Sequence, residues 1–115
     1  MAVSKSIPAA IKRQVKEIVE AFNDEISISW SRYELRFKGP YVYLDRQDPP
    51  RFYSGPIARL EYGGSLTNWR FVIFRYSFDD YDPAEDGFPG FGELDGSIVT
   101  ALRVGLKAYP PDWRP

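Results

Sequence analysis

The sequence predicts an α+β domain in which one helix, four or five antiparallel strands and a second helix follow one another. Apolar residues recur every three or four positions near both ends of the chain, and every second position between them. Residues 69–76 carry large apolar side chains in both phases of a strand, which is typical of a central strand covered on both faces. Because strands and helices are segregated along the chain, we expect both helices to cover the same face of the sheet.

The first helix is predicted over about residues 7–22. Its apolar positions follow the spacing of one helix face: Ile7, Ile11, Val15, Ile18, Val19 and Phe22. Pro8 fits the first helical turn, Ser6 is a candidate N-cap, and Asn23 with Asp24 is expected to end the helix.

The strands are predicted within about residues 26–76. The apolar alternation changes phase near Ser31, which predicts a bulge or a tight bend there. Gly39 and Pro40 predict a hairpin into residues 41–44, and residues 46–56 are rich in turn-forming residues and read as a loop. A second hairpin joins residues 58–62 to the strand at about 67–76 through the turn at 63–65.

An acidic loop is predicted over residues 77–93. Seven carboxylates and no basic residue lie within residues 77–96. Helical spacing then resumes over about residues 95–108, with Asp95 or Ser97 as the candidate cap, and the prolines of residues 109–115 predict an extended tail. The net charge is +4 over residues 1–76 and −5 over residues 77–115, an asymmetry that favours pairing within the fold.

Composition limits the class of protein more than its task. The 115 residues suit a single domain spanning 1–115, and no apolar run approaches the roughly 20 residues that cross a bilayer. We therefore expect a cytoplasmic protein with no membrane association. The chain contains no cysteine and no histidine, which excludes disulfides, thiolate metal sites and histidine-based catalysis. No cofactor and no catalytic residue is predicted.

A pattern of aromatic residues, glycines and prolines extends over about residues 40–110. It comprises residues 56–64, Trp69 with Phe71, Tyr76, Tyr81 with Pro83, and Tyr109 with Pro110. In this pattern the chain resembles small uncharacterised bacterial proteins of unknown function. The resemblance implies a compact single domain and transfers no activity.

The acidic loop contains a partial calcium-loop pattern. Asp82, Asp86, Gly87 and Glu93 occupy positions 1, 5, 6 and 12 of such a loop, but position 3 is Ala84. A strand precedes the segment where a calcium loop requires a helix, so a solvated acidic turn is the favoured interpretation. The less favoured alternatives are a calcium site formed by Asp82, Asp86 and Glu93, and an enzyme that works with carboxylates alone.

The leading functional hypothesis is a small interaction protein without enzymatic activity. Two helices cover one sheet face, so the other, aromatic face is expected to be an exposed apolar interface for a homodimer or a protein partner. The candidate interface residues are Trp30, Tyr43, Phe74 and Tyr76.

Single-stranded nucleic acid is the alternative ligand. Cationic and aromatic side chains alternate along the first strands, which is the chemistry that neutralises phosphates and stacks bases. The candidate residues are Arg32, Arg36, Tyr41, Arg46 and Arg51. Proteins that bind nucleic acid usually carry an excess of basic residues, whereas the pI of this chain is near 5.4. This hypothesis is therefore placed second.

Overall fold

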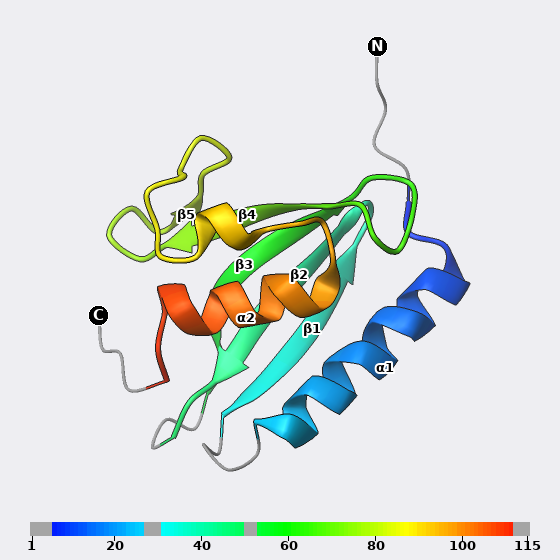
Figure 1. Ribbon diagram of the computed structural model, residues 1–115, viewed down its shortest axis with the longest axis horizontal. Coiled ribbons are helices and arrows are strands. Elements are labelled where there is room, and N and C mark those ends of the chain that lie inside the picture. The colour runs from blue at the N-terminus through cyan, green and yellow to red at the C-terminus, as the bar shows by residue number, and fades with distance from the viewer. Residues whose placement is uncertain (1–5, 27–30, 50–52, 112–115) are drawn as a thin grey trace.

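The computed structural model describes residues 6–26, 31–49 and 53–111 and confirms the α+β architecture. The elements run in the order α1 (Ala9–Glu25), β1 (Arg32–Lys38), β2 (Tyr41–Gln47), β3 (Gly55–Tyr62), β4 (Trp69–Arg75), β5 (Asp80–Tyr81), the 3₁₀ turn η2 (Phe91–Glu93) and α2 (Ile98–Ala108). The strands form one antiparallel meander in sequence order, and both helices lie on one side of it (Figure 1).

The first helix, α1, packs Val15, Val19 and Phe22 into the core, as the spacing predicts. Its N-cap is Pro8, and no side chain caps it, so the prediction that Ser6 is the cap is wrong. The helix also continues to Glu25, beyond the predicted end. Continuation of the helix is favourable because it holds the buried side chain of Asn23 against the outer edge of β1, where it pairs with backbone groups of the strand.

Asn23 makes this contact with both backbone groups of Tyr33. Its Nδ2 donates to the Tyr33 carbonyl at 3.0 Å, and its Oδ1 accepts from the Tyr33 N–H at 2.8 Å. An edge strand presents unpaired backbone groups, and a side chain that pairs with them protects that edge from association with other strands.

The hairpins form where glycine permits them. Gly39, at φ +57°, turns β1 into β2, and the register pairs Lys38 with Tyr41. A register shift falls between Leu44 and Asp45, where β2 pairs with β3. The bend predicted near Ser31 borders residues 27–30, which lie outside the described residues, so it stays a prediction.

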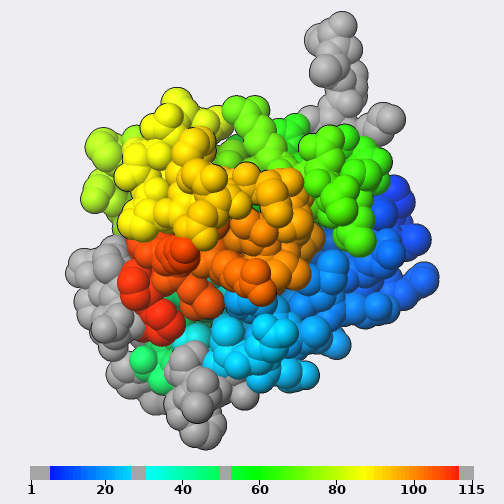
Figure 2. Space-filling model, in the orientation of Figure 1, coloured from blue at the N-terminus to red at the C-terminus, as the bar shows by residue number. Residues whose placement is uncertain are grey.

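The acidic segment is more ordered than the loop that the sequence predicts. Tyr81 of β5 pairs with Phe74, which adds a fifth strand, and Phe88 packs its ring 5.5 Å from Phe71. The segment then lies against α2, as the yellow and orange regions of Figure 2 show. The rings of Tyr81 and Phe88 thus pack against β4, whereas Phe78 and Phe91 of the same segment stay exposed.

The second helix, α2, begins three residues later than the predicted start. Ser97 is its cap, and the Ser97 Oγ accepts from the Thr100 N–H at 3.2 Å. The helix approaches the sheet closely at Gly105, where an added Cβ would come within 2.3 Å of the Tyr33 hydroxyl. Tyr33 in turn donates to the Leu102 carbonyl at 2.7 Å, which fixes the helix on the sheet. No helix in the described part of the chain has the length and hydropathy that a bilayer crossing needs.

Candidate functional site

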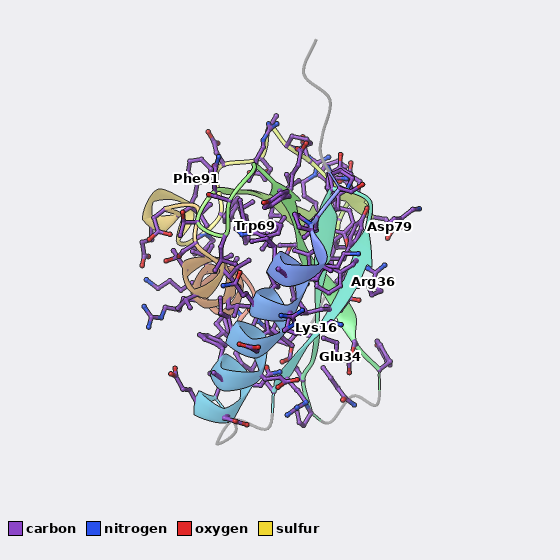
Figure 3. All side chains as sticks on the ribbon, turned by 90° about the vertical axis from the view of Figure 1, so that its right-hand side faces the viewer. Lys16, Glu34, Arg36, Trp69, Asp79 and Phe91 are labelled. Atoms are coloured by element: carbon purple, nitrogen blue, oxygen red, sulfur yellow. The ribbon has the colours of Figure 1, made fainter. Side chains whose placement is uncertain are left out.

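The sheet face opposite the helices is the candidate interaction surface, here called the open face. Side chains alternate along each strand, so the strand registers assign its members. They include Arg32, Glu34, Arg36, Lys38, Tyr41, Tyr43, Asp45, Arg59, Glu61, Arg70, Val72, Phe74 and Tyr81. Figure 3 shows Glu34 and Arg36 on the side of the sheet away from α2.

Guanidinium groups and tyrosine rings stack across this face. Arg36 lies 4.8 Å from the Tyr43 ring centroid, and Arg59 lies 4.6 Å from that of Tyr41 and 5.4 Å from that of Tyr81. Tyr43 and Tyr81 meet edge to face at 5.5 Å. Each cation therefore rests on a ring quadrupole that attracts it, and the stack joins β1, β2, β3 and β5 into one surface.

Arg36 is also neutralised. Its Nε donates to Asp45 Oδ2 at 2.6 Å and its Nη2 to Asp45 Oδ1 at 3.1 Å, a bidentate pair. Burial raises the pKa of Tyr81, and the nearby Asp45 carboxylate adds to this rise. The phenol of Tyr81 thus stays neutral on this surface at physiological pH.

Arg59 lacks such a partner. Within the described part of the chain no carboxylate lies within ion-pair distance of its guanidinium, and its Nε is buried without a hydrogen-bond acceptor. A desolvated donor with no acceptor carries a free-energy cost of about 1–3 kcal/mol. The centre of the open face therefore presents a half-buried cation without an ion-pair partner among the described residues.

The apolar residues of the open face are not exposed. Val72 is 4% exposed and Phe74 is 7% exposed, so the predicted exposed apolar patch is wrong. Phe74 is covered because Tyr81 and Tyr76 each place a ring 5.0 Å from it. The segment after β4, predicted as a solvated loop, supplies one of these covers.

The other predicted interface residues have different positions. Tyr43 lies in the stack on the open face, whereas Tyr76 lies at the end of β4. The hydroxyl of Tyr76 donates to the Pro56 carbonyl at 2.8 Å, and its ring packs against Tyr109. Trp30 lies outside the described residues.

The predicted nucleic-acid residues divide between the two faces. Arg32, Arg36 and Tyr41 belong to the open face. Arg46 is the exception, because its side chain is 1% exposed on the helix side of the sheet. Arg51 lies outside the described residues.

Arg46 has internal acceptors for its guanidinium. Its Nε donates to Asp48 at 2.8 Å, its Nη1 to the Gly105 carbonyl at 3.1 Å, and its Nη2 to the Tyr109 carbonyl. Arg46 thus binds two carbonyls at the C-terminal end of α2: that of Gly105, which also accepts from the Tyr109 N–H, and that of the C-cap residue Tyr109. Arg46 therefore serves the fold and is unavailable to a nucleic acid.

The structure does not bring the predicted calcium ligands together. Asp82 pairs with Arg75 at 3.0 Å and Glu93 pairs with Lys107, whereas Asp86 is exposed. In residues 6–26, 31–49 and 53–111 no three acidic side chains are grouped closely enough to hold a metal ion. The carboxylates are instead held by arginine, lysine and local backbone donors.

Sequence reasoning missed Arg59 and Tyr81 as site residues. Arg59 alternates with Ala58 and Leu60, so its phase already placed it on the opposite face from the apolar residues. Tyr81 gave no such signal, because it lies among carboxylates in a segment with no strand pattern.

Comparisons of the chain with protein-family models, curated proteins and solved structures give no match. The resemblance to small bacterial proteins therefore stays a prediction. The candidate site rests on its geometry alone.

Proposed function

We propose that the protein is a small interaction module. Its open face binds an acidic surface on a protein partner. The observation that carries this proposal is Arg59, a guanidinium held between the rings of Tyr41 and Tyr81 with no carboxylate partner among the described residues. A carboxylate from a partner would supply the opposite charge that Arg59 lacks among the described residues.

The composition of the open face supports a protein partner. Tyrosine and arginine are the residues that dominate binding energy in protein interfaces, especially where neighbouring groups exclude water. Here the rings of Tyr41, Tyr43 and Tyr81 surround the two stacked guanidinium groups. Such rings lose little conformational entropy on binding, because the sheet already holds them in place.

The charges of the open face favour an acidic partner over a second copy of the same face. The face carries five basic side chains, Arg32, Arg36, Lys38, Arg59 and Arg70, against three acidic ones, Glu34, Asp45 and Glu61. A face with a basic excess repels itself, and attracts a surface with an acidic excess. The three carboxylates also lie among the cations, which weakens binding to a continuous phosphate backbone.

The test is a selection of displayed random dodecapeptides on the wild-type protein, with counter-selection on the Arg59→Gln variant. We expect the retained peptides to be rich in aspartate and glutamate. Synthetic versions should lose about tenfold or more in affinity for Arg59→Gln, measured by fluorescence anisotropy, because a central arginine of an interface is a common hot spot. Arg103→Gln is the matched control, since it makes the same charge change on an exposed residue of α2 and should bind as the wild type does.

Two parallel measurements separate the alternatives. Tighter, salt-sensitive binding of labelled oligothymidine that needs Arg59 would replace the proposal with the nucleic-acid hypothesis. Sedimentation that reveals a dimer lost in Arg59→Gln would replace it with self-association. A selection that yields no acidic peptides dependent on Arg59 would overturn it as well.

A further inference from the structure

A cavity of about 300 Å³ lies beyond the open face, at the end of β4. It is bounded by the segment that follows β4 and by the C-terminal end of α2, which lie near one another in Figure 1. Four aromatic side chains line it: Tyr76, Phe78, Phe88 and Tyr109. We call it the aromatic pocket. Its volume is at the lower end of the range for pockets that bind small organic molecules.

The two tyrosines of the aromatic pocket are fixed by the backbone. The Tyr76 hydroxyl donates to the Pro56 carbonyl, and the Tyr109 hydroxyl donates to the Phe74 carbonyl. The two rings meet at 5.4 Å with an interplanar angle of 81°. Because both hydroxyl protons are already used, the tyrosines offer a ligand their aromatic surfaces and no hydroxyl donor.

The charge around the aromatic pocket is negative. Arg75 lines the pocket, but its guanidinium is paired with Asp80 at 2.9 Å and with Asp82 at 3.0 Å. Glu85 also lines the pocket, and in the part of the chain that the structure describes no cation lies within ion-pair distance of it. Its Oε1 accepts only from the backbone N–H of Gly87, at 2.9 Å. Three carboxylates therefore surround one guanidinium, and the pocket carries a net negative charge.

Phe78 adds a second unusual feature. Its side chain is 67% exposed, which leaves an aromatic surface in water at the mouth of the pocket. The Arg75 guanidinium lies 4.2 Å from its ring centroid, so this ring already holds one cation. An exposed ring of this kind costs hydration free energy unless a ligand covers it.

From these observations we infer that the aromatic pocket binds a quaternary ammonium group. Rings attract a cation through their quadrupoles, and a trimethylammonium group suits such a cage because it is bulky, weakly hydrated and has no N–H that needs an acceptor. Glu85 complements its charge from the pocket wall. An anion would meet the unpaired carboxylate of Glu85 while the donors of Arg75 are already occupied, so the same geometry disfavours it.

The first measurement is calorimetric titration of the full chain with choline and with its neutral carbon isostere. Both have the same shape, so only the positive charge distinguishes them. We expect choline to bind at least fivefold more tightly, since a desolvated cation–ring contact and one carboxylate favour the charged form. Equal affinity for the two compounds, or no binding of choline at millimolar concentration, would overturn the inference.

The source of the ammonium group is resolved with peptides that contain trimethyllysine. A trimethyllysine peptide that binds more tightly than choline, while the unmethylated peptide does not bind, would identify a modified protein as the ligand. Choline that binds as tightly as the methylated peptide would identify a free small molecule. Both results support a quaternary ammonium site.

Variants locate the site. Phe78→Ala and Glu85→Gln should each weaken choline binding about fivefold, and both change residues that the core does not need. Tyr53→Ala and Asp86→Asn are the matched controls, because they make the same kinds of change at exposed residues that do not line the pocket. Choline binding that is unchanged in Phe78→Ala and Glu85→Gln would place the ligand elsewhere and contradict the inference.

Discussion

Each face of the sheet carries an arginine stacked on a tyrosine, but the two arginines have different roles. On the helix side Arg46 lies 5.5 Å from the ring centroid of Tyr33, and on the open face Arg59 lies 4.6 Å from that of Tyr41. The buried guanidinium has acceptors at Asp48 and at the end of α2, whereas no described acceptor pairs with Nε of Arg59. A stacked arginine therefore shows its role by the acceptors around it and not by its ring contact.

This difference has an energetic meaning. Burial of a charge is tolerated only where hydrogen bonds and ion pairs replace the lost water. Arg46 meets that condition within the chain, so its contribution is to stability. Arg59 is only half-buried and has no ion-pair partner among the described residues, so a partner protein can still supply the opposite charge. Four predictions test this contrast.

The largest effect is expected from Arg46→Met. The change removes the cation that pairs with Asp48 and the donors that bind the carbonyls of Gly105 and Tyr109. It should lower the free energy of unfolding by about 3–5 kcal/mol, the usual result when one member of a buried ion pair is lost. Urea denaturation measures this loss, and Arg103→Met on the exposed face of α2 is the control. A loss below about 1 kcal/mol would show that Arg46 does not hold the helix.

Alkaline pH should also weaken the contact between α2 and the sheet, because it removes the proton that Tyr33 donates to the Leu102 carbonyl. Burial raises the pKa of Tyr33 to about 12, above its ordinary value of 10.0, although Arg46 opposes the rise. The folded state therefore keeps the phenol proton at a pH where the unfolded chain releases it. Stability is unaffected below about pH 10 and falls between about pH 10 and 12, by roughly 2–3 kcal/mol in all.

Urea denaturation at several pH values checks this dependence in the wild type and in Tyr33→Phe. The variant should be less stable at neutral pH, because it loses the hydrogen bond to Leu102. Its further decline between pH 10 and 12 should be shallower than that of the wild type. Parallel curves for the two proteins would exclude Tyr33 as the titrating group.

A smaller effect is expected from Gly105→Ala. Its Cβ would lie 2.3 Å from the Tyr33 hydroxyl and 3.0 Å from a methyl group of Ile57, so α2 must move outward. Such overpacking costs about 1–3 kcal/mol, which exceeds the gain in helix propensity from replacing glycine. Thermal denaturation measures the loss, and a gain in melting temperature would mean that the helix and sheet can separate without penalty.

The smallest effect is expected on the open face, from Arg36→Gln. This side chain is 57% exposed, so its pair with Asp45 is screened by water. The free energy of unfolding should fall by less than about 1 kcal/mol, although the guanidinium stacks on Tyr43. A loss as large as that of Arg46→Met would remove the distinction between a structural and an available arginine.

The sequence predicted the elements well because their patterns are local. The helical spacing from Val15 to Phe22 and the alternation around Leu60 each depend only on which side of one element is apolar. The ends were less predictable. Asn23 extends α1 because it binds Tyr33, a residue that belongs to another element.

The candidate site was predicted only in part. Arg36 and Tyr41 were named from the pattern of cations and aromatics and Tyr43 as an interface residue, and the three lie together on the open face. The same pattern also included Arg46, which the fold buries, and missed Tyr81, which β5 brings onto the face. Residues of one chemical type cannot be divided between two faces until the covered face is known.

The sequence by itself determined the order and type of the two helices and the first four strands, the absence of histidine and cysteine chemistry, and the phase of those strands. Only the tertiary structure decided which phase the helices cover, which arginine is left without an acceptor, and that the acidic segment encloses the aromatic pocket. The physical reason is that alternation separates two sets of side chains without stating which is buried. That choice depends on contacts between residues far apart in the chain, such as Tyr33 with Leu102.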